Sequence, residues 1–565
     1  MVGSRIAYPL AVLAATLVAV APATAQDKKK RKRPPKPVEI QLLAINDFHG
    51  HLDAAQSGTV TRTGDPLERV PAGGAEYLAT HIRMLRHRNP HTLLVAAGDL
   101  VGGSPLLSSL FHDEATIEVM NRLGMYVSAV GNHEFDEGQA ELRRMQPGGC
   151  HPTDGCRDGN GFSGARFRYL AANVTSTKTG RRFFPAFAVR RIAGVKIGFI
   201  GMTLKGTPRL VSPSSSAGLH FRDEALTANK FARYLRRRRG VHAIVVLLHE
   251  GGFAVKKDVG VDGCPGLSGP IEDIVRRTSH DVDLFLTGHT HQAYNCVIDG
   301  RRVTSAASYG RLITKVELDV SRRSGEVVSV RAHNWVVGQD VMRAPDITAL
   351  IARYARLAAP IRDRVVGRLA RRAGRTRDPS GESKMGNLVA DAQRAATGAT
   401  AAFVNPGIVR AGLPAGDITY GRAFTAQPFG TKLVTMTLSG GHLRDLLKQQ
   451  WCGRGAANVL QVSEGVTYSW SRAAAKAITG KPCADAEDPV SDLRIDGAPV
   501  EPWEAFRVTV NSSLAGGGDQ FYVLHTGGQP EDGEGDADAL ASHLSPSIDG
   551  APLLPPARDR ITLLP

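Results

Sequence analysis

The most informative stretch of the sequence is SAVGNHEFD, residues 128–136. Its first three residues are small or apolar, as in a short buried strand, and Gly131, Asn132, His133 and Asp136 follow closely. Asparagine, histidine and aspartate side chains are good ligands for borderline divalent metal ions. The stretch therefore predicts a strand whose carboxyl end carries metal chemistry.

The same arrangement recurs four more times along the chain. Apolar runs at Ile40–Ile45, Thr92–Ala97, Ala243–Leu248 and Leu284–Thr287 precede, in turn, Asp47 and His49, Asp99, His249, and His289 and His291. Helical patterns such as 74–87 and 223–239 lie between the strands. Strands that alternate with helices predict a layered α/β domain over residues 38–335.

The polar residues that follow these strands can meet in space. In an open α/β sheet the carboxyl ends of the strands border one crevice, so groups far apart in sequence converge there. A lone histidine after a strand is more often structural than a ligand, but five such motifs are difficult to attribute to packing. We therefore predict a metal site made by Asp, His and Asn side chains of these five motifs.

The rest of the chain predicts a second lobe. Residues 346–364 have the apolar spacing of an amphipathic helix, with Ile347, Leu350 and Tyr354 on one face. Residues 365–565 follow with their own helical and strand patterns. The Arg236–Arg239 run is interpreted as the charged end of a surface helix, where positive charge complements the helix dipole.

Composition excludes several classes of protein. The chain has 565 residues, 42% hydrophobic and 22% charged, which is typical of globular proteins rather than disordered or multi-span membrane proteins. The net charge is +16, but residues 1–37 contain eight Lys or Arg and one Asp. The remaining body is only mildly basic, so we expect no specific nucleic-acid partner. The sequence specifies no oligomeric state.

The N-terminus has the pattern of an export signal. Arg5 precedes the apolar run 8–21, and Ala23-Thr24-Ala25 fits a cleavage site, so residues 1–25 are the expected signal peptide. The alternative is an uncleaved anchor, although the run is shorter than a membrane span. Residues 26–37 form a basic, proline-rich tether that either attaches to an anionic envelope or membrane surface or is simply solvated. We expect a secreted, periplasmic or envelope-associated protein.

The six cysteines agree with an oxidising compartment. An even number of cysteines in an exported protein suggests disulfides. Pairing neighbours, as in Cys150 with Cys156, is the simplest of 15 connectivities, and the sequence alone does not choose among them.

The motif order resembles that of a known superfamily. DFH, GDLVGGS, GNHEFD, HEGG and GHTH follow one another as in the calcineurin-like metallophosphoesterases, and MGNL, NPGIVR, QPFG and AGGGD resemble motifs of the 5'-nucleotidase C-terminal domain. The resemblance implies a four-layer α/β fold, a β-sandwich flanked by helices, at residues 38–340. A linker helix at 341–364 and a second, α+β substrate-binding domain at 365–565 would follow.

The resemblance also implies a site with two divalent ions, either Zn, Mn, Fe or Co. One ion would bind Asp47, His49, Asp99 and His291, and the other Asp99, Asn132, His249 and His289. Such ions lower the pKa of bound water from about 15.7 to near 7, which supplies hydroxide for attack on phosphorus. His133 and Asp136 match the family's catalytic dyad, in which the histidine protonates the leaving oxygen or stabilises its charge.

Residues of the second lobe would select the substrate. Those that match the family's nucleotide-binding residues are Asn405, Arg410, Phe429 and Asp519, with Arg377 as a weaker match in an ambiguous segment. Phe429 would stack on the base, but the second aromatic of the family's clamp falls at Ser513. Tyr522 and Phe521 are nearby rings that could replace it.

These expectations lead to one preferred function and several alternatives. The preferred function is an exported 5'-nucleotidase that releases phosphate from nucleoside 5'-monophosphates. The alternatives on the same scaffold are a 2',3'-cyclic nucleotide phosphodiesterase and a UDP-sugar diphosphatase. A non-catalytic envelope-binding protein belongs to a different class, and the complete set of ligand residues argues against it.

Overall fold

The computed structural model describes residues 1–565 except 2, 5–6, 8–35, 64, 255–259 and 485. Most of the expected signal peptide and of the expected tether lies outside the described residues. Among the helices that the structure describes, none combines the length and apolar character needed to cross a bilayer.

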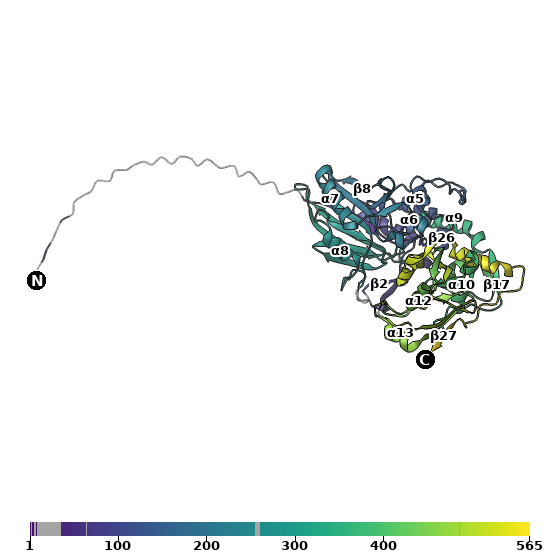
Figure 1. Cartoon of the computed structure of the whole chain (residues 1–565). Coiled ribbons are helices and arrows are strands. Elements are labelled where there is room, and N and C mark those ends of the chain that lie inside the picture. The colour runs from purple at the N-terminus through teal and green to yellow at the C-terminus, as the bar shows by residue number, and fades with distance from the viewer. Residues whose placement is uncertain (2, 5–6, 8–35, 64, 255–259, 485) are drawn as a thin grey trace.

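The first lobe, coloured purple to teal in Figure 1, contains two six-stranded sheets that pack against each other. The strands of the first sheet are, in order, β16 (Val327–Val336), β15 (Leu312–Val320), β1 (Val38–Ile45), β4 (Thr92–Ala96), β5 (Met125–Ala129) and β6 (Arg168–Leu170). Those of the second are β13 (Ala293–Ile298), β14 (Arg301–Ala306), β12 (Leu284–Thr287), β11 (Ala243–His249), β9 (Val195–Thr203) and β8 (Phe187–Ile192).

The central strands are apolar throughout because both of their faces are buried. In β11, Val245 and Leu247 pack between the two sheets, whereas Val246 and Leu248 pack against helices. Strands buried on both faces are nearly continuous apolar runs. The helices are α2 (Ala75–Arg88) and α4 (Glu114–Leu123) outside the first sheet, and α7 (Glu224–Arg239) and α8 (Pro270–Arg277) outside the second. The expected four-layer α/β fold is confirmed.

One expectation from the residue pattern was wrong in detail. The pattern treated the strands before the metal motifs as members of one sheet, but β1, β4 and β5 lie in the first sheet and β11 and β12 in the second. The hydrophobic pattern of a segment predicts that the segment is a strand, but it does not predict which other strand that strand pairs with. Both sets of parallel strands nevertheless end at the same edge of the sandwich, as the contacts among their polar residues show.

The second lobe follows a long connecting helix, α9 (Pro345–Arg362). Its five-stranded sheet has the order β21 (Gln461–Val462), β18 (Ala401–Val404), β25 (Ala505–Asn511), β20 (Lys432–Ser439) and β26 (Gly528–Gly535). A four-stranded sheet contains β24 (Ala498–Pro499), β23 (Val490–Ile495), β22 (Val466–Ser471) and β27 (Ile561–Leu564). The larger helices are α10 (Lys384–Thr397), α11 (Tyr420–Ala426), α12 (Gly440–Lys448), α13 (Arg472–Ile478) and α15 (Asp536–Leu544).

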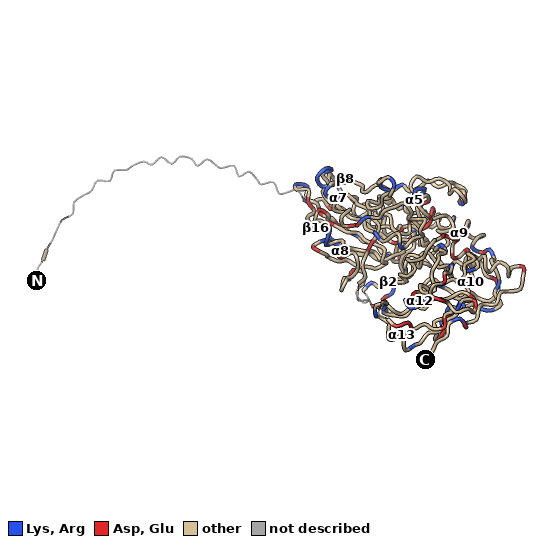
Figure 2. The backbone as a smooth tube through the Cα atoms, viewed as in Figure 1, with Lys and Arg blue, Asp and Glu red and all other residues tan. Residues whose placement is uncertain are grey.

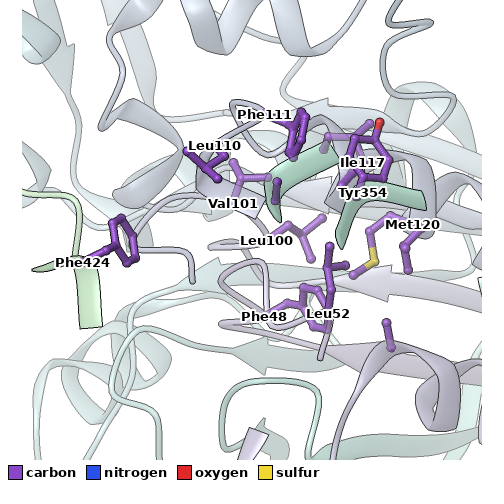
Figure 3. Close-up of a cluster of buried hydrophobic side chains, with 14 of the residues drawn as sticks. Phe48, Leu52, Leu100, Val101, Leu110, Phe111, Ile117, Met120, Tyr354 and Phe424 are labelled. Atoms are coloured by element: carbon purple, nitrogen blue, oxygen red, sulfur yellow. The ribbon is translucent and has the colours of Figure 1, made fainter. Parts of the chain in front are cut away.

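One hydrophobic cluster joins the two lobes (Figure 3). Phe48 and Phe111 of the first lobe belong to the same buried cluster as Tyr354 of α9 and Phe424 of α11. The Tyr354 ring packs edge-on against Phe111, with ring centres 4.9 Å apart, and its hydroxyl donates to Glu118 at 3.0 Å. The two lobes therefore share part of their core in this arrangement.

The cysteines pair as sequence neighbours. The disulfides are Cys150–Cys156, Cys264–Cys296 and Cys452–Cys483. Of the 15 connectivities left open by the sequence, the structure contains the simplest.

Asp536, the first residue of α15, provides a test of the second lobe's stability. Its carboxylate is fully buried and accepts hydrogen bonds from the Thr431 hydroxyl at 2.6 Å and from the Ala537 N–H at 2.8 Å. Burial outweighs these bonds and raises the pKa of Asp536 from 3.8 to about 7.

We predict that the native protein loses stability as pH rises from 4 to 7, because the buried Asp536 carboxyl ionises in this range. Asp536→Asn should abolish this loss, because an amide does not ionise. The pKa of Asp536 is higher in the folded protein than in the unfolded chain. Its contribution to the free energy of unfolding is therefore complete below the pKa of the unfolded state. That contribution declines by at most about 4 kcal/mol as pH rises to the pKa of the folded state. Chemical denaturation across this range measures it. The exposed control Asp549→Asn should keep the native pH dependence, and a D536N curve parallel to the native one would contradict the assignment.

Candidate metal centre

The seven candidate metal ligands follow the carboxyl ends of five strands. Asp47 and His49 follow β1, Asp99 follows β4, Asn132 follows β5, His249 ends β11, and His289 and His291 follow β12. The structure brings all seven side chains into one region at the edge shared by the two sheets. The convergence predicted from the sequence is therefore present, although it involves both sheets.

The ligand atoms form two groups that share a carboxylate. In the first, His291 Nε2 lies 3.4 Å from Asp47 Oδ1 and 3.1 Å from His49 Nε2. In the second, Asp99 Oδ2 lies 2.9 Å from His249 Nε2, and His289 is close to both. Asp99 Oδ2 is also 3.6 Å from His49 Nε2. One carboxylate thus reaches both groups.

Asn132 belongs to the second group. Its Oδ1 lies 3.2 Å from His249 Nε2, and its side chain is almost completely buried. An amide oxygen and an imidazole nitrogen beside a carboxylate are a suitable donor set for a borderline divalent ion.

Hydrogen bonds orient the imidazoles toward the centre of the site. His49 Nδ1 donates to the Gly102 carbonyl at 2.7 Å, and His249 Nδ1 donates to the Ala97 carbonyl at 2.8 Å. Burial lowers the pKa of His49 to about 3, so its neutral ring presents the Nε2 lone pair inward, toward other acceptor atoms. Acceptors that face one another at about 3 Å repel unless a cation lies among them, and metal-binding histidines are commonly oriented in this way. The residues therefore fit divalent cations.

The backbone of the site adopts unusual conformations. Asp47, His49, Asp99, His289 and His291 all have positive φ angles between 47° and 72°. Non-glycine residues rarely adopt this region, and such residues cluster at functional sites. Close packing also requires glycine nearby, because a Cβ at Gly131 would lie 2.1 Å from Asp99 Oδ1.

His133 and Asp136 lie beside the ligand groups. His133 Nδ1 donates to Asp136 Oδ2 at 2.7 Å, and the His133 ring is 4.9 Å from that of His49. Burial alone would lower the pKa of His133, but the Asp136 and Asp99 carboxylates outweigh it and raise the pKa to about 10. His133 is therefore cationic at neutral pH and can donate a proton.

Sequence reasoning missed two residues that hold the ligands. Glu134 is buried and accepts from the backbone N–H groups of Asp99 at 3.0 Å, Leu100 at 2.8 Å and Gly131 at 2.6 Å. Asn46 Nδ2 donates to Asp47 Oδ2 at 2.6 Å and to the Ala307 carbonyl. The signal for both was their position in the motifs, since Asn46 directly precedes Asp47 and Glu134 directly follows His133.

The candidate substrate residues of the second lobe surround two cavities. A cavity of about 320 Å³ is lined by Arg377, Arg410 and Arg375, together with Asn458. Asn458 Nδ2 donates to Asp519 Oδ2 at 3.1 Å, and Asn405 Nδ2 donates to the same oxygen at 2.7 Å. Asn405, Asp519, Arg410 and Arg377 are thus brought together.

Phe429 lies on the other cavity, between the lobes. This cavity of about 740 Å³ is lined by Phe429 and Arg410 of the second lobe and by His51 and Tyr309 of the first. The Arg410 guanidinium is 5.8 Å from the Phe429 ring centre, and Tyr309 is 5.4 Å from the His291 ring. Arg410 therefore lines both cavities and connects the second lobe to the region of the ligands.

The two candidate replacement rings differ in availability. Phe521 is completely buried, with the Arg454 guanidinium 4.4 Å from its ring centre, so it cannot stack on a ligand. Tyr522 is 60% exposed. Ser513 itself adds no ring.

The lobes also touch away from these cavities. A Cβ at Gly516 would lie 1.4 Å from the backbone oxygen of Arg209, so only glycine permits this approach. At the same contact the Ser214 hydroxyl donates to the Asp532 carboxylate.

We predict that Glu134→Gln weakens both folding and metal binding. The substituted amide would direct its own N–H toward backbone N–H groups, and leaving such groups unpaired costs about 1–3 kcal/mol. Denaturant unfolding and titration with Mn²⁺ or Zn²⁺ measure the two effects. The exposed control Glu272→Gln should behave as the native protein, and an E134Q variant with native stability and affinity would show that Glu134 does not hold the site.

Comparison with known proteins matches both lobes. The family model for calcineurin-like phosphoesterases matches residues 40–293, and that for the 5'-nucleotidase C-terminal domain matches residues 365–526. These ranges include the metal-ligand motifs and all the candidate residues of the second lobe.

Individual relatives extend over most of the chain. Endonuclease YhcR of Bacillus subtilis is 31% identical over 85% of this chain, and cell wall protein Lmo0130 of Listeria monocytogenes is 30% identical over 86%. The chain spans only 37% and 64% of the lengths of these two relatives. The crystal structure of a 5'-nucleotidase precursor from Thermus thermophilus superposes with a TM-score of 0.64 and 24% identity, covering 93% of this chain and 99% of that one.

The fold and the family matches agree with the motif order. Calcineurin-like phosphoesterases use divalent metals, and the described residues contain groups suited to bind them. The chain belongs to the 5'-nucleotidase family, with a calcineurin-like phosphoesterase domain followed by a 5'-nucleotidase C-terminal domain.

Proposed function

We propose that this protein is an exported 5'-nucleotidase that uses two divalent ions to release phosphate from nucleoside 5'-monophosphates. The observation that supports this most directly is the pair of ligand groups that share Asp99, next to His133 and Asp136. Export by a signal peptide at 1–25, and a division into domains at 38–340 and 365–565, are parts of the same proposal.

The metal ligands are proposed as follows. Asp47, His49 and His291 hold one ion and Asn132, His249 and His289 the other, with Asp99 between them. Two borderline ions, Zn, Mn, Fe or Co, would supply positive charge that polarises the phosphoryl oxygens and activates water. Burial lowers the pKa of His49 to about 3 and that of His289 to about 4, so both are neutral ligands at physiological pH.

His133 acts on the leaving group. A ring nitrogen of His133 lies within 4.8 Å of ligand atoms of both His49 and Asp99. The raised pKa of His133 favours its protonated form at neutral pH. It donates this proton to the oxygen that leaves phosphorus, or stabilises the charge on that oxygen. Asp136 holds the Nδ1–H of His133, so that Nε2 is directed toward the substrate.

The second lobe binds the nucleoside. Arg410 and Arg377 provide planar, bidentate donors suited to phosphate oxygens, and Asn405 lies with them. Asp519 accepts from Asn405 and Asn458 through Oδ2, and its other oxygen remains for ribose hydroxyls. Phe429 offers a face to the base on the cavity between the lobes.

A specific observation supports a second candidate, hydrolysis of phosphodiesters. Ser513 supplies no ring and Phe521 is buried, so the base lacks a second stacking partner unless the exposed Tyr522 provides it. Stacking contributes roughly 1–3 kcal/mol per base, and selectivity for a free nucleotide falls with it. The similarity to a protein named as an endonuclease agrees with this alternative. The alternative functions that the same fold could carry are those of a 2',3'-cyclic nucleotide phosphodiesterase and of a UDP-sugar diphosphatase.

We predict that His133→Ala lowers kcat for phosphate esters by about 10²–10⁴-fold with little change in KM. Asp136→Asn should lower kcat less, because the imidazole remains. The exposed His280→Ala is the control. Thermal unfolding of the Asp136→Asn variant tests the alternative that Asp136 only stabilises its turn. A variant with lower stability but native turnover would remove Asp136 from the mechanism.

We predict that AMP is hydrolysed faster than bis-p-nitrophenyl phosphate and UDP-glucose, and that EDTA abolishes all three activities. Phe429→Ala should raise KM for AMP about 10–100-fold, through lost stacking, and leave KM for ribose 5-phosphate unchanged. Cleavage of the diester with no release of phosphate from AMP would replace the first proposal by the second. Full activity after thorough removal of metal would end both.

A further inference from the structure

The first lobe has a basic end that is separate from the metal centre. Figure 2 shows Lys and Arg gathered around α7 and β8 at one corner of the molecule. We define the basic end by six exposed arginines on three turns: Arg237, Arg238 and Arg239 at the end of α7, Arg191 at the β8–β9 turn, and Arg322 and Arg323 at the β15–β16 turn.

Contacts fix the three turns side by side. Lys196 pairs with Arg191 across the β8–β9 hairpin, and its Nζ donates to the Arg239 carbonyl at 2.7 Å. Arg322 Nη1 donates to the Ala193 carbonyl of the same hairpin at 3.0 Å. The arginines therefore converge because of the fold, which the sequence run 236–239 did not reveal.

The charges of the basic end are not neutralised within the described part of the chain. None of its six arginines has a carboxylate within 4 Å there, whereas the neighbouring Arg236 pairs with Asp283 at 2.7 Å. Glu326 is an exposed acid in the β15–β16 turn and offsets one charge. Unpaired, exposed arginines at one end produce a positive field that attracts an anionic partner.

The position of the basic end argues against a role in substrate binding. β11 runs from Ala243, next to the basic end, to His249 at the metal centre, and its seven residues span about 20 Å. β1 likewise begins at Val38, which pairs with Val320 beside the β15–β16 turn, and leads to Asp47. The arginines thus lie at the amino ends of the strands and the ligands at the carboxyl ends. A polymer held by the arginines would lie at the far end from the metals.

The chain enters the fold at the same end. Val38 begins β1 there, and the residues before it include KKKRKR at 28–33. The arginines of the three turns therefore lie at the same end of the fold as the start of β1, which the basic residues precede in the sequence, and together they can face an extended anionic surface. We propose that the basic end is a docking surface for the anionic headgroups of a lipid bilayer, with the catalytic edge facing away from it.

Vesicle binding tests the proposal. The purified mature chain, residues 26–565, is mixed with phosphatidylcholine vesicles that contain or lack phosphatidylglycerol, and bound protein is measured by sedimentation at low and high salt. The basic-end variant is Arg237→Gln with Arg238→Gln and Arg239→Gln. The matched control removes three exposed positive charges from the second lobe: Arg472→Gln, Lys476→Gln and Lys481→Gln. Both variants keep the basic tether, residues 26–37, and lack the proposed signal peptide.

The basic-end variant should bind phosphatidylglycerol vesicles about 10–100-fold more weakly than the native protein, since each lost arginine weakens attraction to an anionic surface. The control should bind within about twofold of the native protein, and high salt should release both. Both variants should keep native hydrolysis of AMP or the diester, which shows that they are folded.

Three results would overturn the proposal. The first is an equal loss of binding in the two variants, and the second is equal binding to vesicles without phosphatidylglycerol. The third is binding to polyphosphate or double-stranded DNA without binding to the anionic vesicles, which would assign the basic end to a soluble polymer instead.

Discussion

The Asp99 carboxylate occupies the position on which the site depends. One of its oxygens lies 2.9 Å from His249 Nε2 and 3.6 Å from His49 Nε2, and the other accepts the His133 N–H at 2.9 Å. A buried carboxylate is costly unless cations or donors surround it. Both ligand groups and the backbone of the dyad histidine are therefore fixed by the same side chain.

The surrounding fold serves to place that side chain. β4 delivers Asp99 from the centre of the first sheet, and Glu134 fixes its backbone N–H. The second sheet supplies His249 from the facing layer. Two stacked sheets allow ligands to reach one point from opposite sides, which a single open sheet would provide only from one edge. The helices outside the sheets bury the apolar faces that remain.

The sequence predicted the strands well where both faces are buried. Leu284–Thr287 was predicted with the bounds that the structure has, and Ala243–Leu248 ends one residue early. Continuous apolar runs between turns leave little choice of boundary. The strands β13 to β16 were not predicted individually, because alternating polar and apolar residues are also typical of many surface hairpins. The local sequence pattern also does not show which of the two sheets a strand joins.

The sequence predicted those residues of the site that are proposed to contact metal ions or substrate directly. The seven candidate ligands and the proposed dyad stand in short motifs at strand ends, and their convergence follows from topology. Glu134 and Asn46 act through hydrogen bonds to the backbone and to other side chains, which only the folded chain reveals. The meeting of Arg410 and Phe429 with Tyr309 likewise depends on how the lobes are placed, and the sequence does not encode that in any one segment.

The contact between Gly516 and Arg209 has a consequence for how such two-lobed enzymes diverge. The loops approach so closely that any side chain at position 516 would act as a wedge and push the lobes apart. A substitution at this single position could therefore alter the spacing of the two halves without touching the candidate metal ligands or the candidate substrate residues.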